Sequence, residues 1–245
     1  MPSDAEKLRR VEAELAYVRE EYETFMSAIS HDLSAPLRQI GGFSEIILKN
    51  NEDVLDEKTK RHFNFIAIGA EKGKSIIDAL REFSHLHRNG RDFAEFNSQE
   101  VMEDVLVSLS AWIDQSEAEI DICDLPVMVG DKAQIFKVFF HLLKNSLLYR
   151  HEFLDTKISF SCREEGDFWS FTIIDNGIGV PENMDERIFL VLKRAVAPED
   201  YPGHGIGLAI VEKIVHRHGG TVKLLRDMPS QTIFNFNIPK NPVEI

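Results

Sequence analysis

The stretch LRRVEAELAYVREEYETFMSAI, residues 8–29, decides the fold of the first third of the chain. Its apolar residues recur at steps of three and four, and the positions between them are mostly Glu, Arg and Lys. A seam of this kind, sustained over about three heptads, is typical of a coiled coil and favours self-association over a lone helix packed on the protein's own body. The seam consists of Leu8, Val11, Leu15, Val18, Tyr22, Phe25 and Ile29.

The helical pattern continues past this seam and then turns back. It softens near Pro36 but persists to Ile47, and the polar stretch NNEDVLDEKTK, residues 50–60, predicts a turn. A second apolar set at helical spacing then predicts an antiparallel hairpin. Because one hairpin exposes much apolar surface, we expect two chains to form a homodimer whose hairpins close a four-helix bundle. The second set is Phe63, Ile66, Ala70, Gly73, Ile77 and Leu80.

Beyond Gly90 the pattern changes to alternating helix and strand. The order of elements is typical of a mixed sheet with helices on one side, so the predicted fold class is a helical hairpin followed by an α/β sandwich. Residues 176–203 combine Gly, Pro and charge without periodicity, which predicts a mobile loop. The expected helices span 98–117, 131–150 and 205–219, and the expected strands span 93–96, 127–129, 157–162, 167–175, 221–225 and 232–239.

Composition narrows the class of protein. The 245 residues are 43% hydrophobic, and no apolar run approaches the length of a membrane span. The charged N-terminus is unlike a secretory signal, so we expect a cytoplasmic protein. The formal net charge of −13 argues against a general nucleic-acid binder, which needs a basic face. Cys123 and Cys162 favour two buried thiols in a reducing compartment over a disulfide or a metal site.

Two glycine clusters in the second half indicate a candidate phosphate site. DNGIGVP, residues 175–181, follows an apolar strand, so Asp175 is expected at the strand's end beside glycines that let a ligand approach the backbone. PGHGIGLAI, residues 202–210, opens a helix, and helix N-termini hold phosphate well. Taken singly, the first cluster could be only a tight turn and the second only a flexible hinge. The glycines concerned are Gly177, Gly179, Gly203, Gly205 and Gly207.

A polar side chain on a preceding helix adds to these clusters. Asn145 shares a helix face with His141 and Leu148 and lies beside the expected core stripe, which contains Phe139 and Leu142. Its amide oxygen could bind a magnesium ion that bridges phosphates. A solvent-facing asparagine with no role is the alternative.

The first helix carries a candidate nucleophile. In the heptad register His31 falls at an outward-facing position, beside Asp32 and five residues before Pro36. Neutral imidazole is a nucleophile, and a neighbouring carboxylate can orient the ring and take its proton. Pro36 removes a helical hydrogen bond and permits a kink nearby. The alternative is an idle surface histidine.

Together these features resemble the sensor histidine kinases of two-component signalling, over about residues 20–240. SHDLSAPLR, residues 30–38, resembles the phosphoacceptor box, and FFHLLKNSLLYR, residues 139–150, resembles the asparagine box. The two glycine clusters resemble the glycine boxes, and ERIFLVLKRA, residues 186–195, resembles the phenylalanine box and ATP lid. The runs LPVMVGDKAQIFKVF and RAVAPEDYPGHGIGLAIVEKIVHRHGG are most like the kinase modules of phytochrome-type sensors.

The resemblance implies three domains and one activity. It implies a coiled-coil signalling helix at 1–24, a dimerisation and phosphoacceptor domain at 25–88, and a catalytic ATP-binding domain at 91–241. The activity would be ATP-dependent phosphorylation of His31, with Asp32 as its acidic neighbour, followed by transfer to an aspartate of a response regulator's receiver domain.

The resemblance also implies roles for single residues. Asp175 would accept a hydrogen bond from the adenine amino group, Asn145 would bind Mg²⁺, and Lys193 or Arg194 would reach the terminal phosphate. The glycines of the second box would line the phosphates, and Thr232 would help to hold the adenine. The whole set implied for ATP and magnesium is Asn145, Tyr149, Arg150, Asp175, Gly177, Gly179, Phe189, Lys193, Arg194, Gly203, Gly205, Gly207, Leu208 and Thr232.

Four positions depart from the family's pattern. His141 replaces the usual asparagine, Leu148 a cation and His204 a threonine, which predicts weak ATP binding. Ala35 stands where many members have Thr or Asn, which predicts weak phosphatase activity towards the regulator. One alternative is a degenerate, non-catalytic kinase module that binds partners. Another is a chaperone-like or topoisomerase-like ATPase of the same superfamily, but the helical hairpin that carries HDLSAP argues against it.

Overall fold

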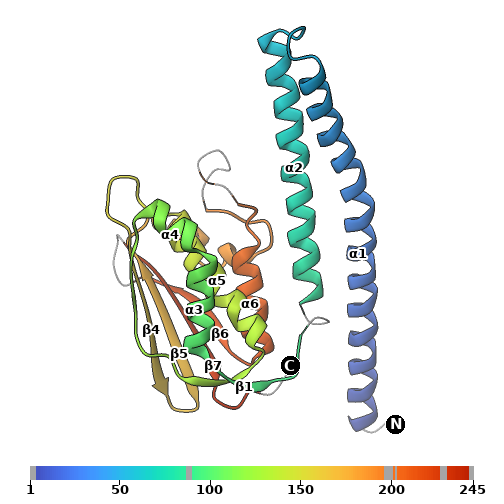
Figure 1. Ribbon diagram of the computed structural model, residues 1–245. Coiled ribbons are helices and arrows are strands. Elements are labelled where there is room, and N and C mark those ends of the chain that lie inside the picture. The colour runs from blue at the N-terminus through green and yellow to red at the C-terminus, as the bar shows by residue number, and fades with distance from the viewer. Residues whose placement is uncertain (1–3, 87–89, 196–200, 202, 227–230, 243–245) are drawn as a thin grey trace. The chain divides into compact units, whose positions relative to one another are not determined.

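The computed structural model describes residues 4–86, 90–195, 201, 203–226 and 231–242. The chain divides into two compact units, Met1–His85 and Leu86–Ile245, each of which is described by itself (Figure 1).

The first unit is a hairpin of two long helices, α1 (Asp4–Asn50) and α2 (Glu57–His85). The helices approach closely where small residues face larger ones, since a Cβ on Gly73 would lie 3.1 Å from a methyl carbon of Leu37. The turn is shorter than the predicted 50–60, because Asp56 Oδ1 accepts a hydrogen bond from Thr59 N at 2.7 Å and starts α2 early. The same hydrogen bond lowers the pKa of the Asp56 carboxyl.

The predicted seam is an exposed apolar face of α1 in the single chain. Leu15 is 64% exposed, and Val11, Val18 and Phe25 are also more than half exposed. The side chain of Leu8, the first member of the seam, lies outside the described residues. The hairpin therefore leaves uncovered the surface on which the prediction of a parallel homodimer rests.

The second unit is an α/β sandwich built on a mixed sheet, as predicted. Five strands run in the order β2-β4-β5-β7-β6, with β2 parallel to β4 and every other pair antiparallel. Figure 1 shows the helices of this unit together on one face of the sheet. The strands are β2 (Glu119–Ile122), β4 (Lys157–Glu165), β5 (Phe168–Asp175), β6 (Thr221–Leu225) and β7 (Thr232–Pro239), and β1 (Ala94–Asn97) pairs separately with β3 (Val127–Gly130).

The helices of this unit differ from the predicted set at one place. The single helix predicted over 98–117 is two helices, because the backbone leaves helical geometry at the buried Leu109 (φ −101°, ψ 4°). The short edge strand β2 was not predicted, since four residues carry little periodicity. The helices are α3 (Ser98–Ser108), α4 (Ser110–Ser116), α5 (Lys132–Leu148) and α6 (Gly207–Arg217), with short 3₁₀ turns at Glu182–Met184 and Arg187–Phe189.

Aromatic packing fixes the orientation of α5 on the sheet. Phe139 of α5 lies with its ring centre 5.1 Å from that of Phe160 and 5.8 Å from that of Phe171. Phe171 stacks on Phe236 at 4.8 Å, and all four side chains are buried. Because this face of α5 packs on the sheet, the faces that carry the polar residues are directed elsewhere.

The two cysteines lie on neighbouring chain segments at the sheet edge. Both are half-buried rather than buried, and Cys123 Sγ accepts a hydrogen bond from Cys162 N at 3.1 Å. Burial raises the pKa of the Cys162 thiol to about 12, so this thiol stays protonated at neutral pH.

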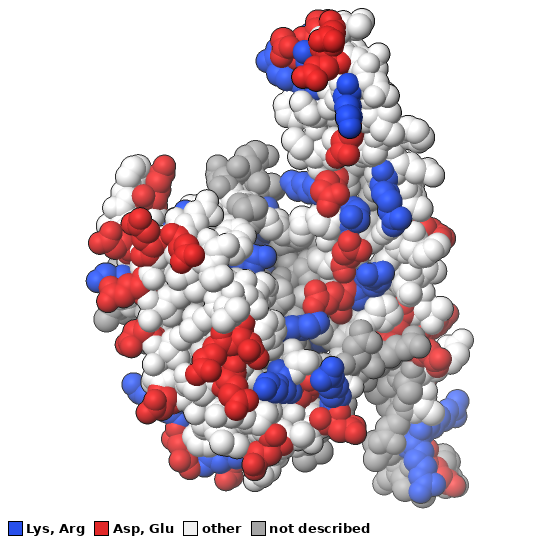
Figure 2. Space-filling view, viewed as in Figure 1, with Lys and Arg blue, Asp and Glu red and all other residues white. Residues whose placement is uncertain are grey.

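Acidic and basic side chains are interspersed over the face shown in Figure 2. Among the described residues, no helix has the length and apolar character needed to cross a bilayer.

Candidate functional site

A buried carboxylate closes strand β5. Asp175 is 5% exposed, and its oxygens accept hydrogen bonds from Ser146 Oγ at 2.9 Å and Gly177 N at 3.0 Å. Thr232, its neighbour on β7, adds a third hydrogen bond. Burial raises the pKa of the Asp175 carboxyl, and the three hydrogen bonds oppose the shift. The carboxyl group is thus held in one orientation at the end of the sheet.

The first glycine cluster is a tight turn fastened to the end of α5. A Cβ on Gly177 would lie 2.4 Å from the carbonyl oxygen of Tyr149, so only glycine fits there. The next amide, Ile178 N, donates to that same carbonyl at 3.0 Å. Gly179 has φ +76°, a conformation that favours glycine. The cluster joins the buried carboxyl of Asp175 to Tyr149, the residue that follows α5 near the end of the asparagine box.

The second glycine cluster runs along the α5 face whose Asn145 was predicted to bind magnesium. A Cβ on Gly207 would lie 3.0 Å from His141 Nδ1, and one on Gly203 would lie 3.8 Å from a methyl carbon of Leu148. Asn145, half-buried, lies one turn after His141 on this face. The structure therefore brings together the face of α5 and the glycines of the second cluster.

The start of α6 suits an anion. Gly207 is its first residue, Leu208 is half-buried in its first turn, and Ile206 at the cap supplies no side-chain hydrogen bond to the backbone. An eleven-residue helix whose first amides are not capped by a side chain carries partial positive charge at that end. Gly205, just before it, has φ +68°, and a Cβ there would lie 2.4 Å from the carbonyl oxygen of Lys193.

The segment between the two clusters is held by contacts of Phe189 and Arg194. Phe189 is buried and packs edge-on against Phe234 at 6.2 Å between ring centres. Arg194 donates to the carbonyl oxygens of Gly203 at 2.8 Å and Tyr201 at 2.5 Å. Residues 196–200 and 202 lie outside the described residues.

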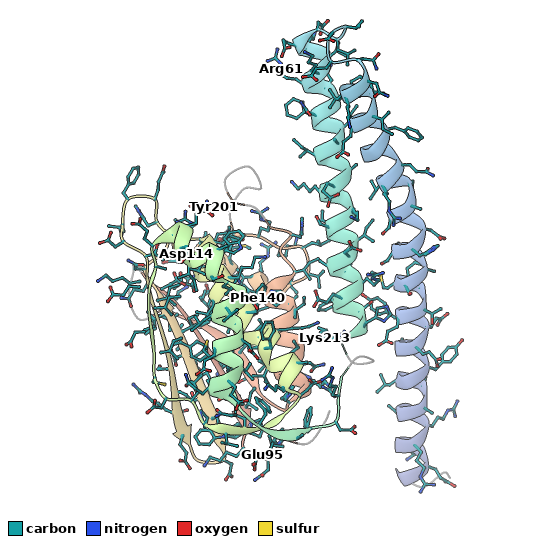
Figure 3. The ribbon with its side chains drawn as sticks, in the orientation of Figure 1. Arg61, Glu95, Asp114, Phe140, Tyr201 and Lys213 are labelled. Carbon is teal, nitrogen blue, oxygen red and sulfur yellow. The ribbon has the colours of Figure 1, made fainter. Side chains whose placement is uncertain are left out.

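The two cations proposed for the terminal phosphate differ in their surroundings. The guanidinium of Arg194 binds backbone carbonyls of the loop, whereas the Lys193 side chain is exposed. Tyr201, labelled in Figure 3, lies with its ring 5.3 Å from the ring of Tyr149. Arg150 Nη1 donates to the carbonyl oxygen of Leu147 at 3.2 Å, so its head group turns back to the end of α5. Of the two cations, Lys193 is the one available to reach a ligand.

The candidate nucleophile lies in the first unit. The His31 side chain is 87% exposed on α1, as its heptad position predicted, and its Nδ1 is 3.0 Å from Asp32 Oδ1. Helix α1 continues through Pro36 without a break, so the permitted kink does not interrupt it. His31 and Asp32 are neighbours in sequence on α1, while the other predicted residues lie in the second unit.

Two contacts of this site were not predicted. Ser146 holds Asp175 across 29 positions of sequence, and Tyr201 meets the ring of Tyr149. A serine next to Asn145 and a tyrosine in an irregular loop carry no local signal of such contacts, because both depend on how the chain folds back.

Comparison with known proteins places two family models on the chain. The His Kinase A (phospho-acceptor) domain matches residues 21–89, and the histidine kinase-, DNA gyrase B- and HSP90-like ATPase matches residues 130–242.

Similar proteins include a phytochrome-like protein and a cyanobacterial phytochrome. The chain is 29% identical to the phytochrome-like protein Cph1 of Synechocystis sp. over 96% of its own length and 31% of that protein, and 32% identical to the cyanobacterial phytochrome B of Nostoc sp. over 89% and 29%. The chain thus spans about a third of the length of these relatives.

Two solved structures share the fold. The histidine kinase ThkA in complex with the response regulator TrrA has a TM-score of 0.60 at 21% identity, over 98% of this chain and 69% of that one. Full-length ShkA in complex with AMPPNP has a TM-score of 0.64 at 18% identity, over 91% and 47%.

Proposed function

Since this chain belongs to the sensor histidine kinases, with a phosphoacceptor domain followed by an ATPase domain, we propose that it binds ATP and phosphorylates its own His31. The observation that carries the proposal is the exposed imidazole of His31, 3.0 Å from the carboxylate of Asp32. The chain covers only about a third of the length of these relatives, so the proposal concerns the kinase reaction and not the signal that controls it.

The contact with Asp32 makes one ring nitrogen the nucleophile. With Nδ1–H donating to Asp32 Oδ1, the lone pair lies on Nε2. Nε2 would form a bond to the γ-phosphorus of ATP while the bond from that phosphorus to the bridging oxygen breaks and ADP leaves. Asp32 would stabilise the positive charge that develops on the ring and take the Nδ1 proton. The exposure of His31 leaves Nε2 open to an incoming phosphate.

The second unit supplies residues that fit the nucleotide. The oriented carboxyl group of Asp175 would accept a hydrogen bond from the adenine amino group, with Thr232 beside it. Tyr149, Gly177 and Gly179 would border the base, because the first glycine cluster is fastened to the Tyr149 carbonyl. Backbone amides of the second cluster and of Leu208 would bind phosphate at the start of α6.

The remaining predicted residues fit the charged end of the nucleotide. Asn145 would hold Mg²⁺ through its amide oxygen, and this ion would neutralise charge on the phosphate oxygens. Lys193 would contact the terminal phosphate, while Arg194 and Phe189 would hold the intervening segment in place. Arg150 would cap the C-terminal end of α5 by donating a hydrogen bond to the Leu147 carbonyl oxygen.

The exposed seam and hairpin support two partners. A second copy of the chain would cover Leu15 and its apolar neighbours in a parallel homodimer, and the phosphorylated His31 would pass its group to an aspartate of a receiver domain. A response regulator accompanies ThkA in a complex of similar fold, which supports this class of partner. Ala35 has no polar atom to position water, so we expect little phosphatase activity.

The test is autophosphorylation of purified protein with radiolabelled Mg-ATP. Wild type and His62→Gln, a matched change at another exposed histidine of the hairpin, should acquire acid-labile, base-stable label, and His31→Gln should acquire none. Full labelling of His31→Gln would contradict the proposal. No labelling of wild type would favour the non-catalytic module.

A further inference from the structure

The segment that follows α2 is held on the second unit at two points. Helix α2 ends at His85, and the carbonyl oxygen of the next residue, the buried Leu86, accepts a hydrogen bond from Gln134 Nε2 at 2.7 Å. Further on, Arg91 N donates to Asp131 Oδ2 at 2.7 Å, and the Arg91 carbonyl accepts from Arg217 Nη2 at 3.1 Å. The entry of the chain into the second unit is therefore fastened.

A buried ionic cluster provides these contacts. Arg217 is 2% exposed, and its Nη1 lies 3.2 Å from Asp131 Oδ2 and 2.8 Å from Gln134 Oε1. Its guanidinium lies 5.0 Å from the ring centre of Phe93 and fills the space in which Gly90 would place a Cβ. A buried charge is costly unless it is paired and hydrogen-bonded. The contacts of this cluster therefore hold the residues that it binds in fixed positions.

We propose that Gln134 and Arg217 are positioning residues for autophosphorylation. They bind the backbone carbonyl oxygens of Leu86 and Arg91, and so keep the covalent tether between the phosphoacceptor helix and the ATPase domain short. This inference rests on the proposed function, because a tether matters only if the ATPase domain must deliver phosphate to His31. Neither residue belongs to the set predicted to contact ATP.

The length of the tether sets how often the two domains meet. With the Leu86 contact in place, the fastened part begins directly after His85. Without it, the five residues from 86 to 90 join the tether and add a reach of up to roughly 17 Å. The effective concentration of two linked modules falls roughly as the −3/2 power of tether length once the tether exceeds the required span. We therefore expect the rate of autophosphorylation to fall about three- to tenfold.

One substitution removes the hydrogen bond to Leu86 and keeps the contact with Arg217. Gln134→Glu keeps an oxygen acceptor for Arg217 and removes the N–H donor to Leu86. The matched control is Gln99→Glu, the same change in the same unit, which preserves its contact because Gln99 Oε1 is the acceptor for Leu125 N. If the added carboxylate beside Asp131 prevents folding, Gln134→Met removes the donor without adding charge.

The readouts are the kinetics of autophosphorylation and hydrogen exchange of the peptide that spans 86–91. In wild type the Arg91 amide should be protected like the core, and in Gln134→Glu this peptide should exchange faster than in Gln99→Glu. The value of kcat should fall about three- to tenfold with KM for ATP unchanged. An unprotected peptide in wild type, or a kcat equal to that of the control, would overturn the proposal. If wild type phosphorylates nothing, the proposed function fails, while hydrogen exchange still decides whether the segment is fastened.

Discussion

Leu148 tests the departure of this chain from the family's nucleotide pocket. It is 9% exposed in the last turn of α5, one turn after Asn145, and its methyl carbon lies 3.8 Å from the Cβ position of Gly203 in the second glycine cluster. The family commonly places a cation at this position. We predict that Leu148→Lys tightens the binding of Mg-ATP.

Two opposing effects set the size of the change. A lysine ammonium that reaches a phosphate makes a charge-assisted hydrogen bond worth about 1.5–3 kcal/mol, or roughly ten- to 140-fold in affinity. Removing a buried leucine costs the nucleotide-free protein about 1.5–3 kcal/mol, and the ammonium must extend past Gly203 to stay hydrated. Because desolvation offsets part of the contact, we expect binding about three- to tenfold tighter and a less stable nucleotide-free protein.

Calorimetry with Mg-AMPPNP and thermal unfolding separate the two effects. The matched control is Leu148→Met, which keeps an apolar side chain of similar volume and should leave affinity unchanged. A folded lysine variant that binds the nucleotide no more tightly than wild type would refute the reasoning. Such a result would mean that His141 or another group already supplies the phosphate contact.

Three further outcomes follow from the structure. Gly177→Ala should lower nucleotide affinity by at least tenfold in calorimetry, because its Cβ would lie 2.4 Å from the Tyr149 carbonyl oxygen, and unchanged affinity would contradict the fit of this turn to the base. Burial raises the pKa of the Asp175 carboxyl, so its protonated form is favoured in the folded state and its contribution to stability is lost as pH rises through the folded-state pKa. Urea unfolding should therefore show Asp175→Asn to be more stable than wild type at neutral pH, and the difference in unfolding free energy should shrink as pH falls. A difference that grows as pH falls would contradict a raised pKa for Asp175. Sedimentation at micromolar concentration should give about twice the 28.0 kDa chain mass for wild type and less for Leu15→Glu, and a wild-type monomer would exclude the proposed homodimer.

Features that depend on local spacing could be predicted from the sequence. The helices of the hairpin follow from steps of three and four, and the outward position of His31 follows from the same register. The turn at Gly177 follows from a glycine placed two residues after the end of a strand. In each case neighbours within one or two turns of chain determine the conformation.

Features that depend on distant contacts could not be predicted. Ser146 orients Asp175, and Arg217 pairs with Asp131 across 86 positions, although neither pair has a spacing that indicates contact. Strand β2 is only four residues long and forms by pairing with β4. The helical pattern over 98–117 gives no sign of the break at the buried Leu109. Tertiary packing decides these positions, so periodicity alone does not reveal them.

The most direct test of the central claim locates the phosphoryl group on the protein. Wild type incubated with Mg-ATP is digested at neutral to alkaline pH, which preserves phosphohistidine, and the peptides are analysed by tandem mass spectrometry. We predict one phosphorylated site, His31, that is absent without ATP and after mild acid. A stable phosphoryl group on a hydroxyl side chain, or on one of the other eight of the nine histidines, would contradict the account.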